Sequence, residues 1–429
     1  MTLPHLPPLP NVRDPAVLRQ HVWDTLTFYD GRCVDESGGL FQFFKDDGTV
    51  YDRHTRHLVS STRYVLTFAQ AARRYPQHPR ASAWLETARH ALRFVQQAHW
   101  RPETGGYAWL LRWQDGRAEV LDATHHCYGL AFVLLAHAHA LQAGITEARD
   151  GLAATFALME QRFWEPDQGL YADEATPNWQ VQPYRGQNAN MHACEAMLAA
   201  YEATGEAPYL ERAYTLAESV TVRLAAHAQG GIWEHYRREA GGPWQPDWDY
   251  NRHDKTNIFR PWGFQTGHFT EWTKLLLNLE RDLRAAGDAR GQAPWLLHRA
   301  QGLFDAAWTH GWDAEHGGLV YGFAPQGSPA TDTAQHVCDG DKYHWVQAES
   351  LAAAAVLATR TGEARYWQAY EQLWAYVWTH FVDHQHGAWF RILGPANQKL
   401  TNEKSPAGKV DYHNMGACHE VMDALRQQA

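Results

Sequence analysis

The chain has 429 residues, of which 45% are hydrophobic, enough to build a large core. Its 38 basic and 48 acidic residues give a net charge of −10 without any basic block, which argues against nucleic acid or an anionic membrane as partner. No run approaches the roughly 18 apolar residues of a membrane span, and the N-terminal MTLPHLPPLP lacks the features of a signal peptide. Five scattered cysteines, never in a C-x-x-C pair, indicate free thiols in the cytoplasm.

Long amphipathic segments, with apolar residues at i, i+3 and i+4, follow one another along the chain. The segments with strand character between them, such as GGLFQFF and GGIWEHY, are too short to build a sheet. We therefore predict an all-α fold. In chain order the predicted helical segments are 62–75, 81–99, 127–141, 189–204, 269–283 and 350–378.

A glycine turn recurs six times, each time as a polar loop, one or two glycines, and then aromatic or aliphatic residues. Because a helix commonly ends on a left-handed residue, we expect these glycines to terminate helices. Spacings of roughly 60 to 90 residues leave room for two helices per repeat. The turns are DESGGLF, ETGGYAW, PDQGLYA, AQGGIWE, EHGGLVY and HQHGAWF, with glycines at 38–39, 105–106, 169, 230–231, 317–318 and 387.

Six two-helix repeats predict a single catalytic domain over residues 1–429, folded as an (α/α)6 barrel with six inner and six outer helices. An open solenoid is the alternative that the repeat by itself leaves standing. The stretch 239–262, EAGGPWQPDWDYNRHDKTNIFRPW, is too long for a simple connection. We expect it to form a lid-like loop over the site.

Polar and aromatic residues recur about 22 to 27 residues after the glycine turn in five repeats, and about 37 residues after it in the repeat with the long loop. Because the inner helices of such a barrel run parallel, these positions should converge at one mouth of the ring. We predict a pocket there. Its predicted residues are Arg63, Tyr128, Asn188, His192, Glu195, His268, Glu271, Trp345, Gln347, Glu349 and His413.

The residue types in this pocket suit proton transfer on a sugar. Two histidines across a ligand can remove a proton from a carbon beside a carbonyl and return it elsewhere. Arg63 could stabilise the resulting enediolate, while Asn188, Gln347 and aromatic rings suit sugar hydroxyls and faces. His268 and Glu271 share one helical face, so we expect Glu271 to orient His268 or to bond to the sugar.

Three other functions use the same residues. The pairs His192/Glu195 and His268/Glu271 could ligate a divalent ion, but no third compact ligand motif accompanies them, so we predict no metal and no other cofactor. An inverting glycoside hydrolase needs two carboxylates roughly 6.5–9.5 Å apart, for which the glutamates of the pocket are candidates. A non-catalytic sugar-binding or partner-binding ring would give the convergent histidines no role.

Four ordered motifs, RGQNANMHACEA, FRPWGFQTGHFTEW, KYHWVQAES and KVDYHNMGACHE, resemble those of the N-acylglucosamine 2-epimerase superfamily. The resemblance extends over nearly the whole chain, from about residue 25 to 422. The R-G-x-N-x-N-M-H block and the D-Y-H ending look most like the aldose–ketose isomerase branch. Cellobiose 2-epimerases typically have a tryptophan where this chain has Asp411.

This resemblance implies metal-independent proton transfer on an open-chain monosaccharide, with His268 and His413 as the acid/base pair. It further implies that D-mannose, or a relative such as D-lyxose, is interconverted with its 2-ketose through a cis-enediolate. A sugar 2-epimerase would share these residues, so that alternative stays open, as does the oligomeric state. The residues that match substrate-binding or supporting positions of the family are Arg63, Tyr128, Asn188, His192, Glu271 and Glu349.

Overall fold

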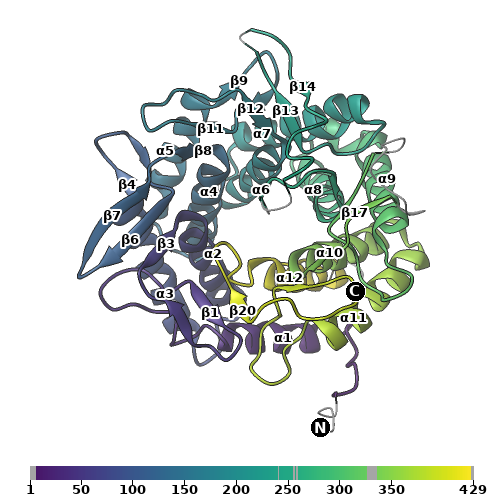
Figure 1. The fold of residues 1–429 in the computed structure, drawn as a ribbon, viewed down its shortest axis with the longest axis horizontal. Coiled ribbons are helices and arrows are strands. Elements are labelled where there is room, and N and C mark those ends of the chain that lie inside the picture. Colours follow the sequence, from purple (N-terminus) through teal and green to yellow (C-terminus); the bar gives the residue numbers. More distant parts are fainter. Residues whose placement is uncertain (1–5, 240, 255–256, 258, 326–335, 427–429) are drawn as a thin grey trace.

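Two concentric layers of helices form a ring in the computed structural model, which describes residues 6–239, 241–254, 257, 259–325 and 336–426 (Figure 1). In this described part, six inner α-helices surround the axis and six outer ones pack against them. The predicted all-α (α/α)6 barrel is confirmed.

The inner helices are α2 (Leu58–Arg74), α4 (Cys127–Gln142), α6 (Gln187–Thr204), α8 (Thr266–Ala285), α10 (His344–Thr361) and α12 (Tyr412–Arg426). The outer helices are α1 (Pro15–Thr27), α3 (Ala81–Phe94), α5 (Ala148–Arg162), α7 (Ala207–Glu218), α9 (Pro294–Gly311) and α11 (Ala364–His380). Short π or 3-10 turns lie at Val95–His99, Ser219–Leu224, Ala225–Ala228 and Ala289–Gln292.

The two ends of the chain close the ring. Each inner helix from α2 to α10 packs against the outer helix that follows it, whereas α12 packs against α1, the first helix of the chain. Helix α12 also contacts α2, so that neighbouring inner helices touch all the way round. An open solenoid could not make these contacts, and that alternative is wrong.

The glycine turns lie between each outer helix and the next inner helix. Five of them are closed by an antiparallel bridge across the turn. The expected left-handed backbone is present, for example at Gly169 (φ +61°) and Gly387 (φ +81°). It occurs in hairpin turns several residues beyond the helix ends, however, and not at the helix caps. The bridged pairs are Val34–Leu40, Trp100–Tyr107, Trp164–Tyr171, Trp312–Leu319 and Val382–Trp389.

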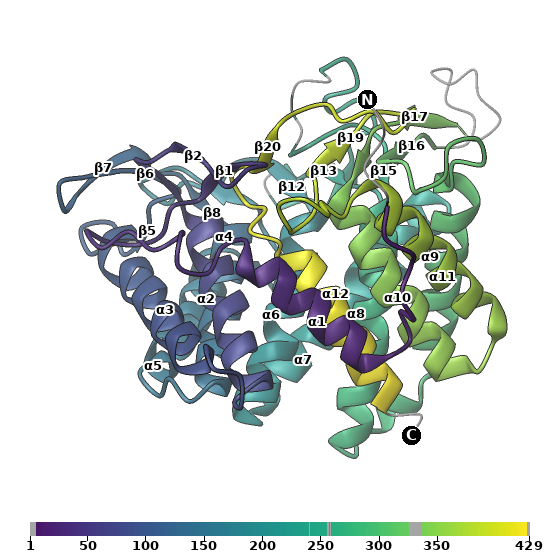
Figure 2. The ribbon, with the colours of Figure 1, turned by 90° about the horizontal axis from the view of Figure 1, so that it is seen from below.

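Short strands gather at one end of the ring, above the first turns of the inner helices (Figure 2). They pair in small antiparallel sheets, so the expectation that these segments are too short to build a sheet is wrong. One of these sheets, β2–β1–β20, pairs segments near the two ends of the chain, with Phe44 opposite Ser405. The strands are β1 (Phe43–Lys45), β2 (Val50–Asp52), β3 (Thr55–His57), β4 (Trp100–Arg101), β5 (Gly106–Tyr107), β6 (Leu110–Gln114), β7 (Arg117–Asp122), β8 (His125–His126), β9 (Trp164–Glu165), β10 (Leu170–Tyr171), β11 (Glu174–Ala175), β12 (Tyr184–Gly186), β13 (His235–Arg237), β14 (Gln245–Pro246), β15 (Phe264–Gln265), β16 (Gly322–Phe323), β17 (Val337–Asp339), β18 (Lys342–Tyr343), β19 (Ile392–Leu393) and β20 (Glu403–Ser405).

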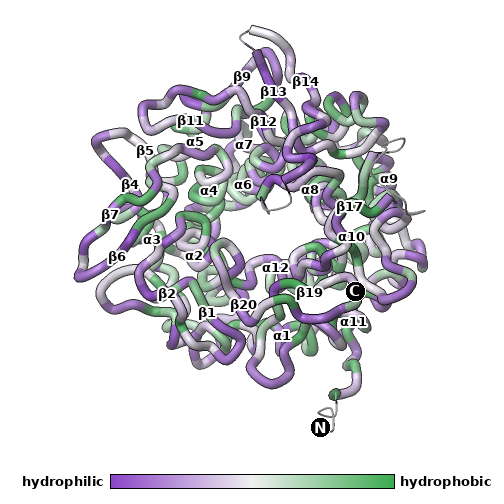
Figure 3. Tube along the Cα trace, in the orientation of Figure 1, coloured by the Kyte–Doolittle hydropathy of each residue, from purple (hydrophilic) through white to green (hydrophobic). Residues whose placement is uncertain are grey.

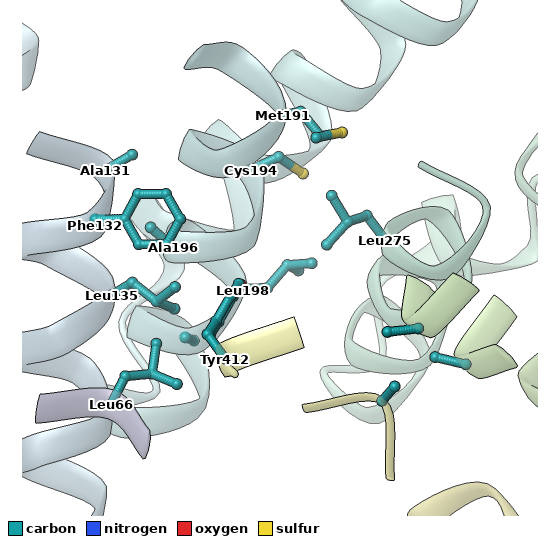
Figure 4. Packing of buried hydrophobic residues seen from close by; sticks show 14 of the residues in the cluster. Leu66, Ala131, Phe132, Leu135, Met191, Cys194, Ala196, Leu198, Leu275 and Tyr412 are labelled. Atoms are coloured by element: carbon teal, nitrogen blue, oxygen red, sulfur yellow. The ribbon is translucent and has the colours of Figure 1, made fainter. Parts of the chain in front are cut away.

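Hydrophobic side chains hold the inner helices together. Figure 3 shows apolar residues along α4 and α6 and polar residues over many of the connecting segments. In Figure 4, Phe132 and Leu135 of α4 and Leu198 of α6 project toward their neighbours, and all three are buried. This packing fixes where the first turn of each inner helix lies. In the described part of the chain, none of the helices combines the length and the apolar character needed to cross a membrane.

Candidate active site

A cavity of about 670 Å³ opens at the mouth of the ring. Its walls are the first turns of the inner helices and the loops that lead into them. Each inner helix contributes its second or third residue, because parallel helices in matching register present equivalent positions to the axis. These six residues are Val59, Tyr128, Asn188, His268, Trp345 and His413.

A second set of side chains, one helical turn deeper, forms the floor of the cavity. Arg63, His192 and Glu271 line it, each as the sixth residue of its helix. Phe132 and Glu349 are the sixth residues of α4 and α10 and lie beside or behind this floor. All five side chains are buried. The structure thus brings together the histidines, the arginine and the carboxylates that the repeat predicted.

His268 is held by a carboxylate from outside its own helix. Its Nδ1 lies 2.9 Å from Oε1 of Glu234, and Oε2 of Glu234 accepts a 2.8 Å hydrogen bond from Nε2 of Gln187. Because a carboxylate only accepts, Nδ1 carries the proton and Nε2 is left as an acceptor without a partner in the described chain. Of the two expected roles of Glu271, the orientation of His268 is therefore wrong: Glu234 reaches the ring from the hairpin after the fourth glycine turn.

His413 has a partner of the same kind in a different electrostatic setting. Its Nδ1 lies 2.7 Å from Oε1 of Glu349, whose Oε2 accepts a 2.7 Å hydrogen bond from Nζ of Lys274. The proton on Nδ1 again leaves Nε2 free. Burial, and next the positive charge of Arg63, lower the pKa of His413 well below its ordinary value. The ring is therefore neutral at neutral pH and can accept a proton.

Asp411 fixes the entry into α12. Val410 and Asp411 both have left-handed backbone (φ +44°), a conformation that costs roughly 1–3 kcal/mol in a non-glycine residue. The buried carboxylate of Asp411 offsets this strain by accepting hydrogen bonds from the Tyr29 hydroxyl (2.5 Å) and from Nζ of Lys409 (2.6 Å). Asp411 thus acts on the position of His413 and is not part of the cavity lining.

Trp345 stands between the two histidines. Its ring centroid lies 5.2 Å from that of His268 and 5.8 Å from that of His413. Gly267 makes this possible, since a Cβ at that position would come within 2.2 Å of the indole. The indole offers a flat apolar surface between two imidazoles, which suits the face of a sugar.

A third histidine, His192, is anchored in the same way. Its Nδ1 lies 2.9 Å from Oε2 of Glu195, and the Tyr412 hydroxyl donates to the other oxygen of Glu195. Burial lowers the pKa of His192. Its ring packs edge-on against Tyr128, with centroids 5.1 Å apart. The H-x-x-E pair of α6 is thus a hydrogen-bonded pair.

Glu271 is buried without a hydrogen-bond partner for either carboxyl oxygen in the described chain. Burial, and then the neighbouring carboxylate of Glu349, raise the pKa of Glu271 well above its ordinary value. The raised pKa favours the protonated carboxyl, which offers an O–H donor. Asn188 likewise has a buried, unbonded Oδ1. Such groups are costly to leave unpaired, so both are suited to the hydroxyls of a polar ligand.

Arg63 supplies a fixed positive charge beside the floor. Its guanidinium donates to the carbonyl of Gly408 and to the Tyr128 hydroxyl (3.3 Å). It also lies over the rings of Phe132 and Tyr412, 4.4 Å and 4.7 Å from their centroids. These contacts hold the charge in place before any ligand arrives.

Gln347 and Glu349, both predicted to bind substrate, do not line the cavity. Gln347 is fully buried, and its side-chain amide donates to the carbonyl of Leu319 (2.7 Å) and accepts from its N–H (2.9 Å). It therefore fastens the fifth glycine turn to α10. Glu349 acts behind His413. Helix register cannot distinguish a side chain that faces the axis from one that faces an adjoining hairpin.

Residues on the hairpins are the part of the site that sequence reasoning missed. Glu234, Trp109 and Tyr321 each come three residues after the last glycine of a turn, and all line the cavity. The signal was present in GGIWEHY, where a glutamate stands among aromatic residues at a position that recurs between repeats. Counting that position across the six turns would have found Glu234.

Part of the stretch 239–262 reaches the cavity; residues 240, 255, 256 and 258 of it lie outside the described part. Arg260 links this stretch to the loop before α6, with one guanidinium nitrogen 2.9 Å from Oδ1 of Asp173 and 2.7 Å from Oε2 of Glu174. The same guanidinium lies over the Tyr184 ring, 4.0 Å from its centroid. The residues of the stretch that line the cavity are Asn257, Phe259, Arg260 and Pro261.

Within the described residues, three groups of histidines and acids bring potential metal-ligand atoms within 4.8 Å of one another. In each group side chains are already engaged by hydrogen bonds or by a cation of the chain, such as Lys274 or Arg260. Glu271, which belongs to two of the groups, is the exception, since its carboxyl oxygens have no hydrogen-bond partner in the described chain. The alternative metal site, in which His192/Glu195 and His268/Glu271 share an ion, is present only in part: His192, Glu195 and Glu271 form a group, but His268 turns to Glu234. The groups are His126–Asp173–Glu174, His192–Glu195–Glu271 and Glu271–Glu349–His413.

Comparison of the sequence with known protein families agrees with the fold and the site. The profile of the N-acylglucosamine 2-epimerase family covers residues 39–417, and the chain belongs to this family.

Relatives place the chain more closely within the family. The D-mannose isomerase of Marinomonas mediterranea is 48% identical over 410 residues, which are 95% of this chain and 97% of that protein. A crystal structure of D-mannose isomerase matches with a TM-score of 0.88 and 47% identity, over 96% of this chain and 99% of the other. The cellobiose 2-epimerase structure from Spirochaeta thermophila shares the fold, with a TM-score of 0.79 at 24% identity over 96% of each chain.

Proposed function

We propose that the protein is an aldose–ketose isomerase that interconverts D-mannose and D-fructose and also accepts D-lyxose. One observation carries the proposal: His268 and His413 meet at one cavity, each with Nδ1 held by a carboxylate and Nε2 left free. Similarity to relatives named D-mannose isomerase supports the choice of sugar.

His413 is the carbon base in this proposal because its ring is neutral. Its Nε2 takes the proton from C2 of the open-chain aldose, the C–H electrons form the C1–C2 double bond, and the carbonyl π electrons move to O1. The same proton returns to C1. His268 transfers the hydroxyl proton from O2 to O1, so that O2 becomes the carbonyl oxygen. No proton or electron is gained or lost overall.

The floor stabilises the enediolate between these steps. All six inner helices begin at the cavity, and their N-termini carry partial positive charge. Arg63 adds a full charge held in place by its contacts. The protonated Glu271 donates to a sugar oxygen and Asn188 accepts from a sugar hydroxyl. Tyr128, His192 and Trp345 complete the binding surface.

The proposed reaction uses no metal. Most carboxylates that could ligate an ion already have partners in the chain: Glu349 has Lys274, Glu195 has His192, and Asp173 and Glu174 have Arg260. An ion would have to displace these partners. We expect exhaustive chelation to leave turnover unchanged. Activity that is lost on chelation and restored by a single divalent ion would contradict this part of the proposal.

Two rivals from the sequence can be weighed against the geometry. Oxygens of Glu271 and Glu349 approach within 4.8 Å, closer than the roughly 6.5–9.5 Å between the carboxyl groups of inverting hydrolases. A non-catalytic ring leaves the two free Nε2 atoms without a role. A sugar 2-epimerase uses the same groups, and it differs in returning the proton to C2 from the opposite face.

The product spectrum in D2O distinguishes these reactions. With D-mannose as substrate, we expect fructose that carries deuterium at C1, or that is unlabelled where the proton is transferred without exchange. Glucose as the main product would make the protein a 2-epimerase. The absence of both products, and of deuterium at C1 and C2, for D-mannose and D-lyxose would contradict the proposal.

We also place the protein in the cytoplasm as part of this proposal. None of its five cysteines is paired in a disulfide, as in proteins of reducing compartments.

A further inference from the structure

Lys274 lies beneath the floor of the active site, one helical turn beyond Glu271 on α8. It follows Glu271 by three residues on α8 and is only 5% exposed. Its Nζ donates to Oε2 of Glu349 at 2.7 Å, and Oε1 of the same carboxylate holds Nδ1 of His413 at 2.7 Å. Lysine, glutamate and histidine thus form a chain that ends at the ligand cavity.

The surroundings of Lys274 are strongly acidic. Burial lowers its pKa, but the carboxylates of Glu349 and Glu420 outweigh burial and hold that pKa above its ordinary range. The lysine therefore stays charged and offsets the negative charge of Glu349, which it contacts directly. The charged or titratable groups that face Lys274 or His413 are Arg63 on α2, His192 and Glu195 on α6, Glu271 on α8, His344 and Glu349 on α10, and Glu420 on α12.

We propose that Lys274 is a positioning residue: its ammonium keeps Glu349 ionised, so that His413 carries its proton on Nδ1 and presents an unprotonated Nε2 to the sugar. This inference rests on the proposed role of His413 as the carbon base. Without the ammonium, Glu349 would be a buried carboxylate with no cation in contact, and it would take up a proton. A protonated Glu349 donates to Nδ1, which moves the imidazole proton to Nε2 and blocks the base.

A second cavity gives access to this lysine from the far side of the ring. It measures about 110 Å³ and shares no lining residue with the active-site cavity. Lys274, Glu195, Glu349 and Tyr412 line its inner end, and the exposed side chains of Arg73 and Glu202 line its outer end. A small cation from solvent can therefore reach the position of the Lys274 ammonium without crossing the sugar site.

The test uses the full-length chain and three variants. Lys274→Met removes the charge but keeps much of the volume, and Lys274→Ala opens space for an added amine. Lys342→Met is the matched control, since Lys342 is also fully buried and pairs with a carboxylate, Asp313, away from His413. Each is assayed for kcat and KM with D-mannose from about pH 5.5 to 9, a range that spans the ordinary histidine pKa. The ring ¹⁵N shifts of His413 in the substrate-free protein report its tautomer without any turnover.

For Lys274→Met we expect kcat to fall about 30- to 100-fold, within the range of a lost acid–base contribution, while KM changes little. Because Glu349 must now lose a proton for activity, the acid limb of the kcat profile moves to higher pH. The His413 ¹⁵N shifts should show the Nε2–H tautomer. In Lys274→Ala, ammonium or methylammonium chloride should restore kcat at least about tenfold, whereas sodium or tetramethylammonium chloride should not. Lys342→Met should retain the wild-type profile.

Wild-type kcat and an unmoved acid limb in folded Lys274→Met would overturn the proposal, as would an unchanged His413 tautomer. If Lys274→Met does not fold, the double variant Lys274→Met/Glu349→Gln is compared with Glu349→Gln alone. In Glu349→Gln the lysine no longer has this carboxylate as its partner. The double variant should then turn over as Glu349→Gln does, and a further loss would contradict an action through Glu349. Failure of the proposed function gives a different result. In that case the wild-type protein does not convert D-mannose, although Lys274→Met still changes the His413 tautomer.

Discussion

The two histidine–carboxylate pairs of the active site share their geometry and differ in their charge. Glu349 is neutralised by Lys274 on the side away from His413, whereas Glu234 is met by an amide, that of Gln187. In the described part of the chain no lysine or arginine pairs with Glu234. His413 therefore faces a compensated carboxylate and His268 faces an uncompensated one.

This difference in charge between the two pairs suits the imidazole rings of His268 and His413 to different proton transfers. Glu234 holds Nδ1 of His268 and leaves Nε2 available to take up and pass on a hydroxyl proton. Lys274 and Arg63 oppose an additional positive charge on His413, which suits it to take a proton from carbon. Two identical side chains thus receive different roles from groups that do not touch the sugar.

Removing either ring should have the largest effect. We expect His268→Asn and His413→Asn each to lower kcat by about 10³-fold or more, because each step loses its proton carrier. Steady-state turnover of D-mannose measures this, with thermal unfolding as the check that both variants fold. The exposed His227, replaced by asparagine, is the control. A variant of either site histidine that retains more than a tenth of the wild-type kcat would remove that histidine from the mechanism.

Replacing Glu234 or Glu349 by glutamine should distinguish the two histidine–carboxylate pairs by the free energy of unfolding. We expect Glu234→Gln and Glu349→Gln each to lower kcat about 10²-fold, since glutamine does not hold the imidazole tautomer. Only Glu349→Gln also strips a buried lysine of its partner, which should cost about 3 kcal/mol of unfolding free energy. Glu234→Gln should cost about 1 kcal/mol. Urea unfolding measures both, and equal losses would contradict the difference in charge.

The fold followed from the sequence because a barrel of repeats is encoded redundantly. Six glycine turns and the helical periodicity between them predict the number of helices and the register of the inner ones. That register is enough to place His268, His413 and Arg63 together. It could not show that α1 completes the last hairpin by packing against α12, because that contact joins the two ends of the chain.

Pairings between side chains were less predictable than positions. Spacing on one helix favoured Glu271 as the partner of His268, but Glu234 arrives from a hairpin earlier in the sequence. Gln347 has the register of a pocket residue, yet it binds the backbone of Leu319. Both outcomes depend on where the loops fold, and the repeat period carries no information on that.

Glu271 should show a smaller, pH-dependent effect. Since burial raises its pKa, the carboxyl is a neutral donor in the free protein, and Glu271→Gln retains a neutral donor there. We expect about a tenfold loss of kcat/KM at neutral pH, in line with one weakened hydrogen bond. As pH rises through the raised pKa, the wild type ionises and loses its donor, while the glutamine variant cannot. The ratio of the two kcat/KM values should therefore fall at high pH, and a ratio independent of pH would contradict a protonated Glu271.

Arg260 should have the smallest effect, and on binding rather than chemistry. It joins the loop at the cavity mouth to Asp173 and Glu174 and does not touch either histidine pair. For Arg260→Ala we expect KM to rise about three- to tenfold, as when one partly exposed ion-pair network is lost, with kcat within about twofold. Arg252→Ala is the control, because Arg252 pairs with Asp249 within the same loop. A fall in kcat at constant KM would mean that the loop acts on the proton transfers themselves. It would contradict the assignment of binding to the cavity mouth and of chemistry to the residues deeper in the cavity.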